Sequence, residues 1–258
     1  LSASFGMHSQ SLPMIYYLYS VFDSASNSYI QTNKTLGLSK SIHYVLGYDW
    51  NFAKDFRLKL ETYYQDLYNT PVEKYRKTSF SAGNAGNELS GITLMDSLEN
   101  KGTGTNYGTE ITLEKFFSKN FYFLNSLSLY DSRYKGSDGI LRHSAFSGGY
   151  VYNLLGGIEI PLGKKNHFIG FDAKFTFAGG NRYTPVDLQQ SVLQSGPVYI
   201  DSLAFSKQFR PYRKIDIKLS YRINRKKASH YIYFHIENVF HHKNVLQQVY
   251  NDAKKEMT

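Results

Sequence analysis

Three glycines in quick succession are the first candidates for chemistry in this chain. The stretch KGTGTNYGTEITLEKFF (residues 101–117) places Gly102, Gly104 and Gly108 close together, as in a loop that binds a dinucleotide phosphate. Such a loop must be followed by a helix, because the free N–H groups at the helix start bind the phosphate. Here the third glycine comes one residue late, and the residues after it alternate between apolar and polar types, which indicates a strand. The pattern favours Gly102 and Gly104 as loop residues, and Gly108 as a strand residue whose missing side chain leaves room for a neighbour.

Two further groups of side chains could be interpreted as reactive. His235, Glu237, His241 and His242 are metal-binding residue types, but their spacing matches no zinc motif. The second group is charged and comprises Arg57, Lys59, Glu61, Lys214, Asp216 and Lys218. Its members recur at every second position, which is typical of a wet sheet face with cross-strand pairs. No Gly-x-Ser-x-Gly or His-Glu-x-x-His motif occurs. The sequence therefore predicts no catalytic residue, no metal site, no cofactor and no enzyme.

The composition limits the classes of protein to which the chain can belong. Its 258 residues allow one large or two small domains, and the absence of cysteine excludes disulfides and thiolate metal sites. The net charge is +9, but the basic residues are scattered along the sequence, so we expect no nucleic-acid partner. No apolar run is long enough for a membrane-spanning helix. With 23 Tyr and 18 Phe, the chain is rich in side chains that suit a wet binding face or a membrane interface.

Apolar and polar residues alternate over most of the chain, which predicts strands. We expect nine of them, at 1–8, 41–52, 56–67, 106–117, 121–132, 146–160, 167–178, 211–223 and 231–240. No segment has a convincing helical period. The sequence predicts an all-β chain.

The lengths of the expected connections also alternate. Those at 53–55, 118–120, 161–166 and 224–230 are short, and those at 9–40, 68–105, 133–145 and 179–210 are long. In an up-and-down antiparallel sheet, alternate connections lie at opposite ends. Short turns at one end and long loops at the other are typical of outer-membrane barrels.

Strand length agrees with a membrane barrel. About 11 residues at roughly 3.3 Å each, tilted by about 40°, span on the order of 28 Å, close to the hydrocarbon core of a bilayer. The charged group named above would then face a wet lumen, and Trp50, Phe52, Phe117 and Tyr221 at strand ends would form interfacial girdles. A soluble sandwich or barrel would also show this alternation, so it remains an alternative fold. Sandwich strands, however, average about half this length.

Nine strands make neither an even number nor a closed cylinder, so we expect a piece of a longer barrel. Residues 1–258 are then one domain, a partial outer-membrane β-barrel without its plug domain and final strands.

Four motifs carry a resemblance to a known family. GTGTNYGTEITLEKFF resembles the loop-to-strand element of TonB-dependent outer-membrane receptors, and AGGNRYTPVDL (178–188) followed by FRPYRKIDIKLSYRIN (209–224) resembles a late loop and strand of their barrel. FHIENVFHHKNV (234–245) is similar to their penultimate strand element. GMHSQSLPMIYYLYS (6–20) resembles a loop of the subgroup that carries an N-terminal carboxypeptidase-regulatory-like domain.

This resemblance implies a transmembrane barrel of 22 strands in the bacterial outer membrane, of which the chain supplies about nine. It also implies four partners: outer-membrane lipid, an N-terminal plug domain of the same protein, TonB acting through the missing N-terminal part, and a scarce extracellular nutrient. From the residues, aromatic and basic loop side chains are the candidates for ligand contact. They are Tyr16, Tyr17, Tyr19, Arg182 and Tyr183. A passive porin and a soluble β-rich binding protein remain alternatives.

Overall fold

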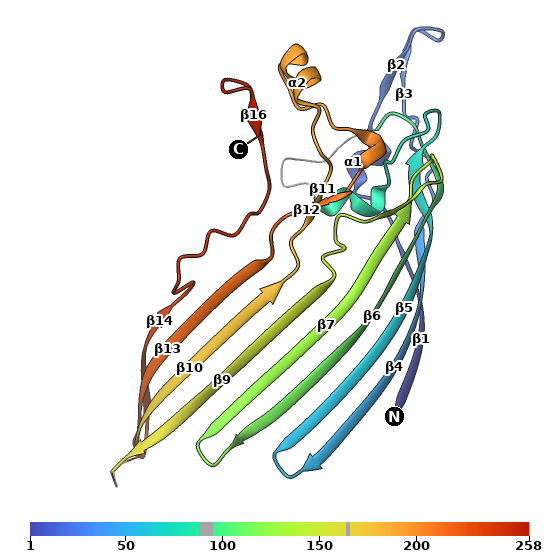
Figure 1. The fold of residues 1–258 in the computed structure, drawn as a ribbon. Coiled ribbons are helices and arrows are strands. Elements are labelled where there is room, and N and C mark those ends of the chain that lie inside the picture. The colour runs from blue at the N-terminus through green and yellow to red at the C-terminus, as the bar shows by residue number, and fades with distance from the viewer. Residues whose placement is uncertain (88–94, 164–165, 258) are drawn as a thin grey trace.

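A computed structural model describes residues 1–87, 95–163 and 166–257. Residues 88–94 and 164–165, which belong to two of the expected connections, lie outside the described residues. One antiparallel sheet dominates the molecule, and its strands run side by side and obliquely (Figure 1). The long strands are β1 (Ser2–Gln10), β4 (Ser39–Ala53), β5 (Phe56–Glu73), β6 (Leu98–Ser118), β7 (Phe121–Lys135), β9 (Tyr150–Leu162), β10 (His167–Ala178), β13 (Tyr212–Asn224) and β14 (Ser229–Ile236).

These strands confirm the all-β, antiparallel expectation, and each coincides with one of the nine expected segments. Strands β5 and β6 are longer than the alternation predicts, because their ladder continues past a register shift near Thr70 up to Glu73 and Leu98. Each long strand pairs with the next long strand in the chain, in the order β1-β4-β5-β6-β7-β9-β10-β13-β14. The connectivity is therefore up-and-down.

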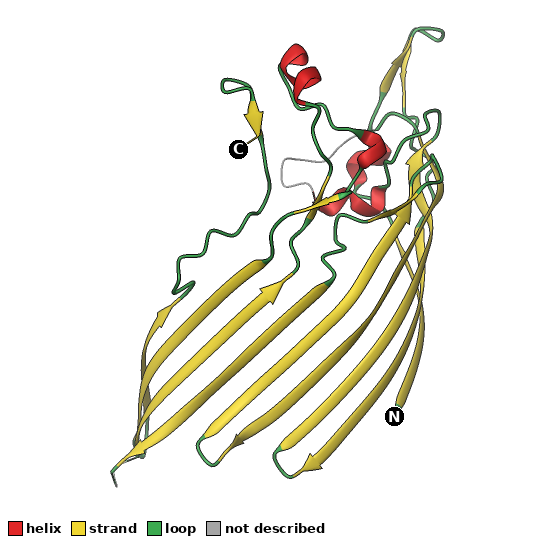
Figure 2. Ribbon diagram, viewed as in Figure 1, coloured by secondary structure: helices red, strands yellow, loops and turns green. Residues whose placement is uncertain are grey.

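The remaining elements are short and belong to the connections. The strands are β2 (Val21–Asp23), β3 (Ser28–Ile30), β8 (Leu141–His143), β11 (Arg182–Tyr183), β12 (Lys207–Gln208), β15 (Tyr250–Asn251) and β16 (Glu256–Met257). The helices are α1 (Met14–Leu18), α2 (Leu188–Gln194), η1 (Ala82–Asn87) and η2 (Asp201–Leu203). The expectation of no helix is wrong for these loops, because helices of three to seven residues are too short to give a periodic pattern. Figure 2 shows them in red at one end of the sheet.

The two ends of the sheet differ as the connection lengths predict. The turns β4–β5, β6–β7, β9–β10 and β13–β14 lie at one end, which we call the short-turn end (Figure 1). Residues 11–38, 74–97, 136–149 and 179–211 form the long loops at the opposite, long-loop end. At the short-turn end, Lys119 and Asn120 have φ angles of 49° and 68°. Two consecutive positive φ values are the geometry of a type I′ hairpin turn, which matches the right-handed twist of the strands.

A lysine braces this same turn. The Nζ atom of Lys115, a buried residue, donates to the carbonyl oxygens of Phe116, Ser118 and Phe121 at 3.2, 2.9 and 3.0 Å. It also donates to the Ser118 hydroxyl at 2.9 Å and lies 3.8 Å from the centre of the Phe121 ring. Three carbonyl oxygens around the register shift and the turn therefore share one charged donor.

The register places both groups of charged residues on one face of the sheet. Paired residues share a face, and the pairs run through Arg57, Glu114, Leu124, Leu155, Lys174 and Asp216 in successive strands. We call this the polar face. The neighbouring row runs through Leu58, Leu113, Asn125, Leu154, Phe175 and Ile215, and we call its side the apolar face.

Large side chains on the apolar face are exposed instead of forming a core. Across four adjacent strands, Phe5, Tyr44, Tyr64 and Tyr107 stand in one register row and are 43–60% exposed. Among the described residues, the buried apolar side chains lie at the long-loop end; they are Tyr16, Val72, Leu98, Tyr134, Ala145 and Ala204. The sheet is thus held by its ladder and its cross-strand pairs, and compact packing occurs where the loops meet it.

Two of the three glycines have a different role from the expected one. Gly102 and Gly104 lie inside β6, not in a loop. A Cβ atom on Gly102 would lie 2.6 Å from Val72 Cγ1 and 2.8 Å from the Thr70 carbonyl oxygen, so the glycine allows β5 and β6 to meet at the irregular part of their ladder. Gly108 is on the polar face, as expected, and the space above it holds the neighbouring side chains of Tyr63 and Tyr130.

Candidate ligand-facing surface

Charged side chains on the polar face pair with one another at the short-turn end of β5. The Arg57 guanidinium donates to Asp49 on β4, with 3.0 Å from its Nε to a carboxylate oxygen, and lies 3.9 Å from Glu114 on β6. Lys59 and Glu61 form a second pair at 2.5 Å. One of these charge pairs joins neighbouring strands and the other lies within β5, and both stabilise the sheet without a catalytic role.

The second charged triple forms a similar network on β13. Lys214 Nζ lies 2.6 Å from Glu237 and 3.3 Å from Asp216, and Lys218 Nζ lies 2.9 Å from Asp172 on β10. The Tyr122 hydroxyl of β7 donates to the same Asp172 carboxylate at 2.6 Å. The structure confirms that all six predicted residues share one face. That this face lines a lumen stays a prediction.

Hydrogen bonds connect the four long loops to one another, and we call the connected residues at this end of the sheet the loop platform. Asn33 is buried and joins the first two loops: its amide donates to the Met95 carbonyl at 2.8 Å, and its oxygen accepts from the Leu98 N–H at 2.9 Å. The Asp201 carboxylate accepts the Ser79 hydroxyl at 2.6 Å and the Ser79 N–H at 3.1 Å, which joins the second and fourth loops.

The third loop is held on both sides. Its Ala145 N–H donates to the Asn84 side chain at 3.0 Å, and Ser137 Oγ donates to the Arg76 carbonyl at 2.7 Å. From the fourth loop, Gln208 Nε2 donates to the Gly148 carbonyl at 2.9 Å. The Phe205 ring packs edge-on against Tyr134 of the polar face, with 6.0 Å between ring centres. Because these partners are 60 to 122 residues apart or come from different loops, no local sequence signal identifies them.

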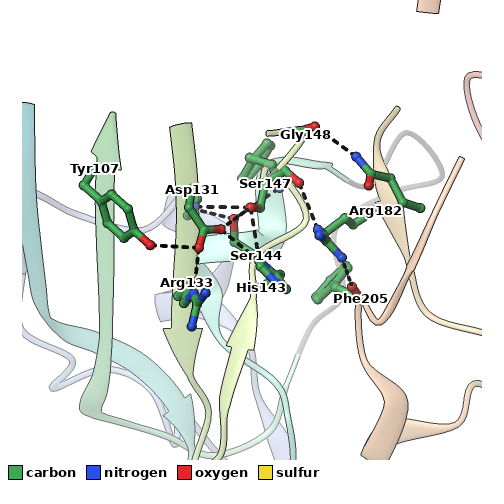
Figure 3. A network of polar contacts seen from close by, with 12 residues as sticks. Tyr107, Asp131, Arg133, His143, Ser144, Ser147, Gly148, Arg182 and Phe205 are labelled. Carbon is green, nitrogen blue, oxygen red and sulfur yellow. Dashed lines mark hydrogen bonds and ion pairs between the residues drawn. The ribbon is translucent and has the colours of Figure 1, made fainter. Parts of the chain in front are cut away.

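Asp131 is the centre of another polar network at the long-loop end (Figure 3). Its carboxylate accepts from Tyr107 at 3.2 Å, Arg133 at 2.7 Å and Ser147 at 2.6 Å, and lies 2.9 Å from His143 Nδ1. The register row places Asp131 on the apolar face, next to Tyr107. Four neighbours from three segments therefore fix the third loop to the edge of that face.

This combination of Ser, His and Asp is not arranged for nucleophilic catalysis. A triad places the serine and the carboxylate on different ring nitrogens, so that the histidine can take the serine proton. Here the Ser147 hydroxyl and Asp131 both contact Nδ1 of His143, at 3.3 and 2.9 Å, and Ser147 also bonds directly to Asp131. The geometry supports a structural role.

A buried ion pair strengthens the third loop. Arg142, on β8, contacts both carboxylate oxygens of Asp138 at 3.0 and 2.7 Å. Burial alone would raise the pKa of the Asp138 carboxyl, but the hydrogen bonds from Arg142 and from the Ile140 N–H outweigh burial and lower this pKa below its ordinary value of 3.8. Asp138 is therefore ionised at neutral pH.

The five predicted ligand contacts have different positions. In α1, Tyr16 is 1% exposed, whereas Tyr17 and the following Tyr19 are partly exposed. Arg182 binds the loop platform: its Nε donates to the Ser147 carbonyl at 2.9 Å, as Figure 3 shows. Tyr183 stacks on Phe209, with 4.3 Å between ring centres. Tyr16, Arg182 and Tyr183 thus have structural contacts, and ligand binding by the five residues stays a prediction.

The four residues considered as metal ligands do not converge. Glu237 pairs with Lys214, and His242 interacts through its backbone with Asn238. Within the described ranges, no group of three or more His, Cys, Asp or Glu is placed to hold a metal ion.

The chain matches no model of a known protein family and no protein of curated function. Among the helices that the structure describes, none has the length and apolar character needed to cross a membrane.

Proposed function

We propose that the chain is part of the wall of a transmembrane barrel in the bacterial outer membrane, in a TonB-dependent receptor that binds an extracellular nutrient and takes it up. The observation that carries this proposal is the exposed apolar face on strands of eight to 21 residues. A soluble sheet of this size would bury that face against a second layer. Lipid covers such a face without any second layer.

Aromatic side chains support the same placement. Trp50, Phe52 and Phe117 are exposed near the short-turn end. Tyrosine and tryptophan favour the two membrane–water interfaces because their rings are amphipathic. In this placement the long loops are extracellular and the loop platform faces the ligand.

The loop platform supports a binding role in preference to a passive pore. Its loops are cross-linked by buried Asn33, by Asp201 and by Gln208, so a ligand would meet a preorganised surface. Preorganisation increases affinity because less conformational entropy is lost on binding. In the proposed receptor, the plug domain would contact the charged polar face, and TonB would act through the plug.

Two neighbouring residues of β6 provide a test of membrane placement. Ile111 is on the apolar face and Thr112 is on the polar face. Ile111→Arg should reduce insertion into lipid vesicles by about 2–4 kcal/mol, because its charge would lie in hydrocarbon, whereas Thr112→Arg should have a much smaller effect. Insertion is measured as protection from added protease. Equal effects of the two variants, or a wild-type chain that folds without detergent or lipid, would favour the soluble class.

The transport step has a separate test. Uptake of a candidate nutrient by the full-length gene product should stop in cells that lack TonB and return when TonB is restored. Uptake that is independent of TonB would assign the barrel to the passive porins.

A further inference from the structure

The net positive charge of the chain is concentrated at the short-turn end. The described residues of the four short turns (54–55, 119–120, 163, 166 and 225–228) include five basic residues and one acidic residue. The described residues of the four long loops include eight basic and five acidic residues, although these loops are far longer. The basic residues look scattered in the sequence because the turns are far apart along the chain. The up-and-down topology brings the described basic turn residues to one end.

Five of these cations are free in the structure. Lys54, Lys119, Arg225, Lys226 and Lys227 are exposed. Their side chains make none of the hydrogen bonds or ion pairs found among the described residues, whereas charged side chains further along the strands, such as Arg57, are paired. Asp55 is the acidic residue of these turns, and its backbone oxygen accepts the Phe116 N–H. Lys164 and Lys165 lie outside the described residues, and the proposal does not use them.

Exposed aromatic rings adjoin these cations. Phe116 and Phe117 precede the turn that carries Lys119, Phe121 follows it, and Phe52 precedes Lys54. Aromatic rings at the level of the lipid headgroups, with free cations just beyond them, are the pattern of a surface that binds an anionic membrane.

We propose that the five turn cations, with their adjoining rings, bind the phosphate groups of anionic phospholipids in the leaflet that the short-turn end enters. This inference rests on the proposed membrane placement and adds a lipid class and a site to it. Charge complementarity selects the occupant, because a phosphate at the headgroup level meets cations that have no carboxylate partner. A membrane surface of purely zwitterionic lipids would attract these five cations less strongly. Lys115, already bound to turn oxygens, does not contribute.

The test compares two variants of equal charge. In the turn variant, Lys54, Lys119, Arg225, Lys226 and Lys227 are replaced by Gln. In the control variant, exposed residues away from the short-turn end, namely Lys34, Lys74, Lys77, Lys207 and Lys243, are replaced by Gln. Insertion of each chain is measured in phosphatidylcholine vesicles with and without phosphatidylglycerol, at low and at high salt.

We expect phosphatidylglycerol to increase insertion of the wild-type and control chains at low salt. In the turn variant, the increase in insertion caused by phosphatidylglycerol should be smaller by about tenfold or more. High salt should remove this difference between the turn variant and the other two chains. A turn variant that retains the full increase, or a control variant that loses as much of it, would overturn the proposed site while leaving membrane placement intact. Failure of all three chains to insert into either kind of vesicle would instead contradict the membrane placement itself.

Discussion

At the scale of single residues, paired charges and buried amides hold the long loops in place. The Arg142 side chain is 7% exposed, and its two terminal nitrogens contact Asp138, whereas its buried Nε has no hydrogen-bond partner among the described residues. Removal of one partner from a buried pair leaves the other charge unpaired, which costs more than the pair itself contributes. Loss of the Asp138 carboxylate should therefore destabilise the whole third loop.

Asp138→Asn should lower the free energy of opening of residues 136–149 by about 3 kcal/mol. Hydrogen exchange of the backbone amides in this loop measures the effect. Asp252→Asn is the matched control, because its pair with Lys255 at 2.7 Å is exposed and should contribute little to stability. Equal exchange in both variants would show that the buried pair does not hold the loop.

The same carboxyl predicts a pH dependence. Since the pKa of Asp138 is lower in the folded protein than its ordinary value of 3.8, the ionised group stabilises the loop above that value. This stabilisation should disappear as the pH falls through the lowered pKa. Hydrogen exchange at a series of pH values should show the wild-type loop approaching the Asp138→Asn variant only below about pH 4. A difference that is already lost near neutral pH would contradict this assignment.

At the scale of elements, the short turns and close strand contacts depend on a few specific atoms. Lys115 supplies a charged donor to three carbonyl oxygens at the β6–β7 turn, and Gly102 supplies the space that β5 requires. Neither function is visible from hydrophobic alternation, because alternation specifies faces and not the irregular ends of ladders.

Lys115→Met should destabilise the β6–β7 hairpin by about 1–3 kcal/mol, because several carbonyl groups lose their donor while the aliphatic part of the side chain is retained. Protease sensitivity at residues 118–121 reports on the turn. Lys119→Met is the control, since Lys119 is exposed and donates to none of these oxygens. A Lys115→Met chain as resistant as the control would rule out the bracing role.

Gly102→Ala should cost about 1–3 kcal/mol in stability through crowding with Val72 and Thr70. Gly37→Ala offers a comparison, because its added Cβ would meet only the Asn100 side chain, at an ordinary 3.6 Å. Denaturant unfolding in detergent micelles measures both. Equal stabilities would show that β5 and β6 can separate at this point without cost.

At the scale of the whole molecule, the sheet presents two different faces and two open edges. Strands β1 and β14 are the ends of the sheet path, and the described residues do not pair them with each other. All eight residues of β14 are exposed. Unpaired edges bind further strands, which agrees with the proposal that the chain is one arc of a larger barrel.

The absence of cysteine allows a direct test of the two faces. Leu60→Cys on the apolar face and Glu61→Cys on the polar face each provide a single site for a spin label. In vesicles, oxygen should broaden the label at 60, because oxygen concentrates in lipid, and a water-soluble nickel complex should broaden the label at 61. Equal access of the nickel complex to both sites would contradict contact of the apolar face with lipid.

The sequence by itself determined the all-β class, the nine long strands, the face on which Arg57 and Asp216 lie, and the alternation of short and long connections. It could do so because side-chain alternation is local: one residue in a strand fixes the direction of the next. Only the tertiary structure decided the loop platform around Asn33 and Asp201, the positions of Gly102 and Lys115, and the gathering of free cations at the short-turn end. These features depend on residues that are distant in the chain and become neighbours only after the strands have paired.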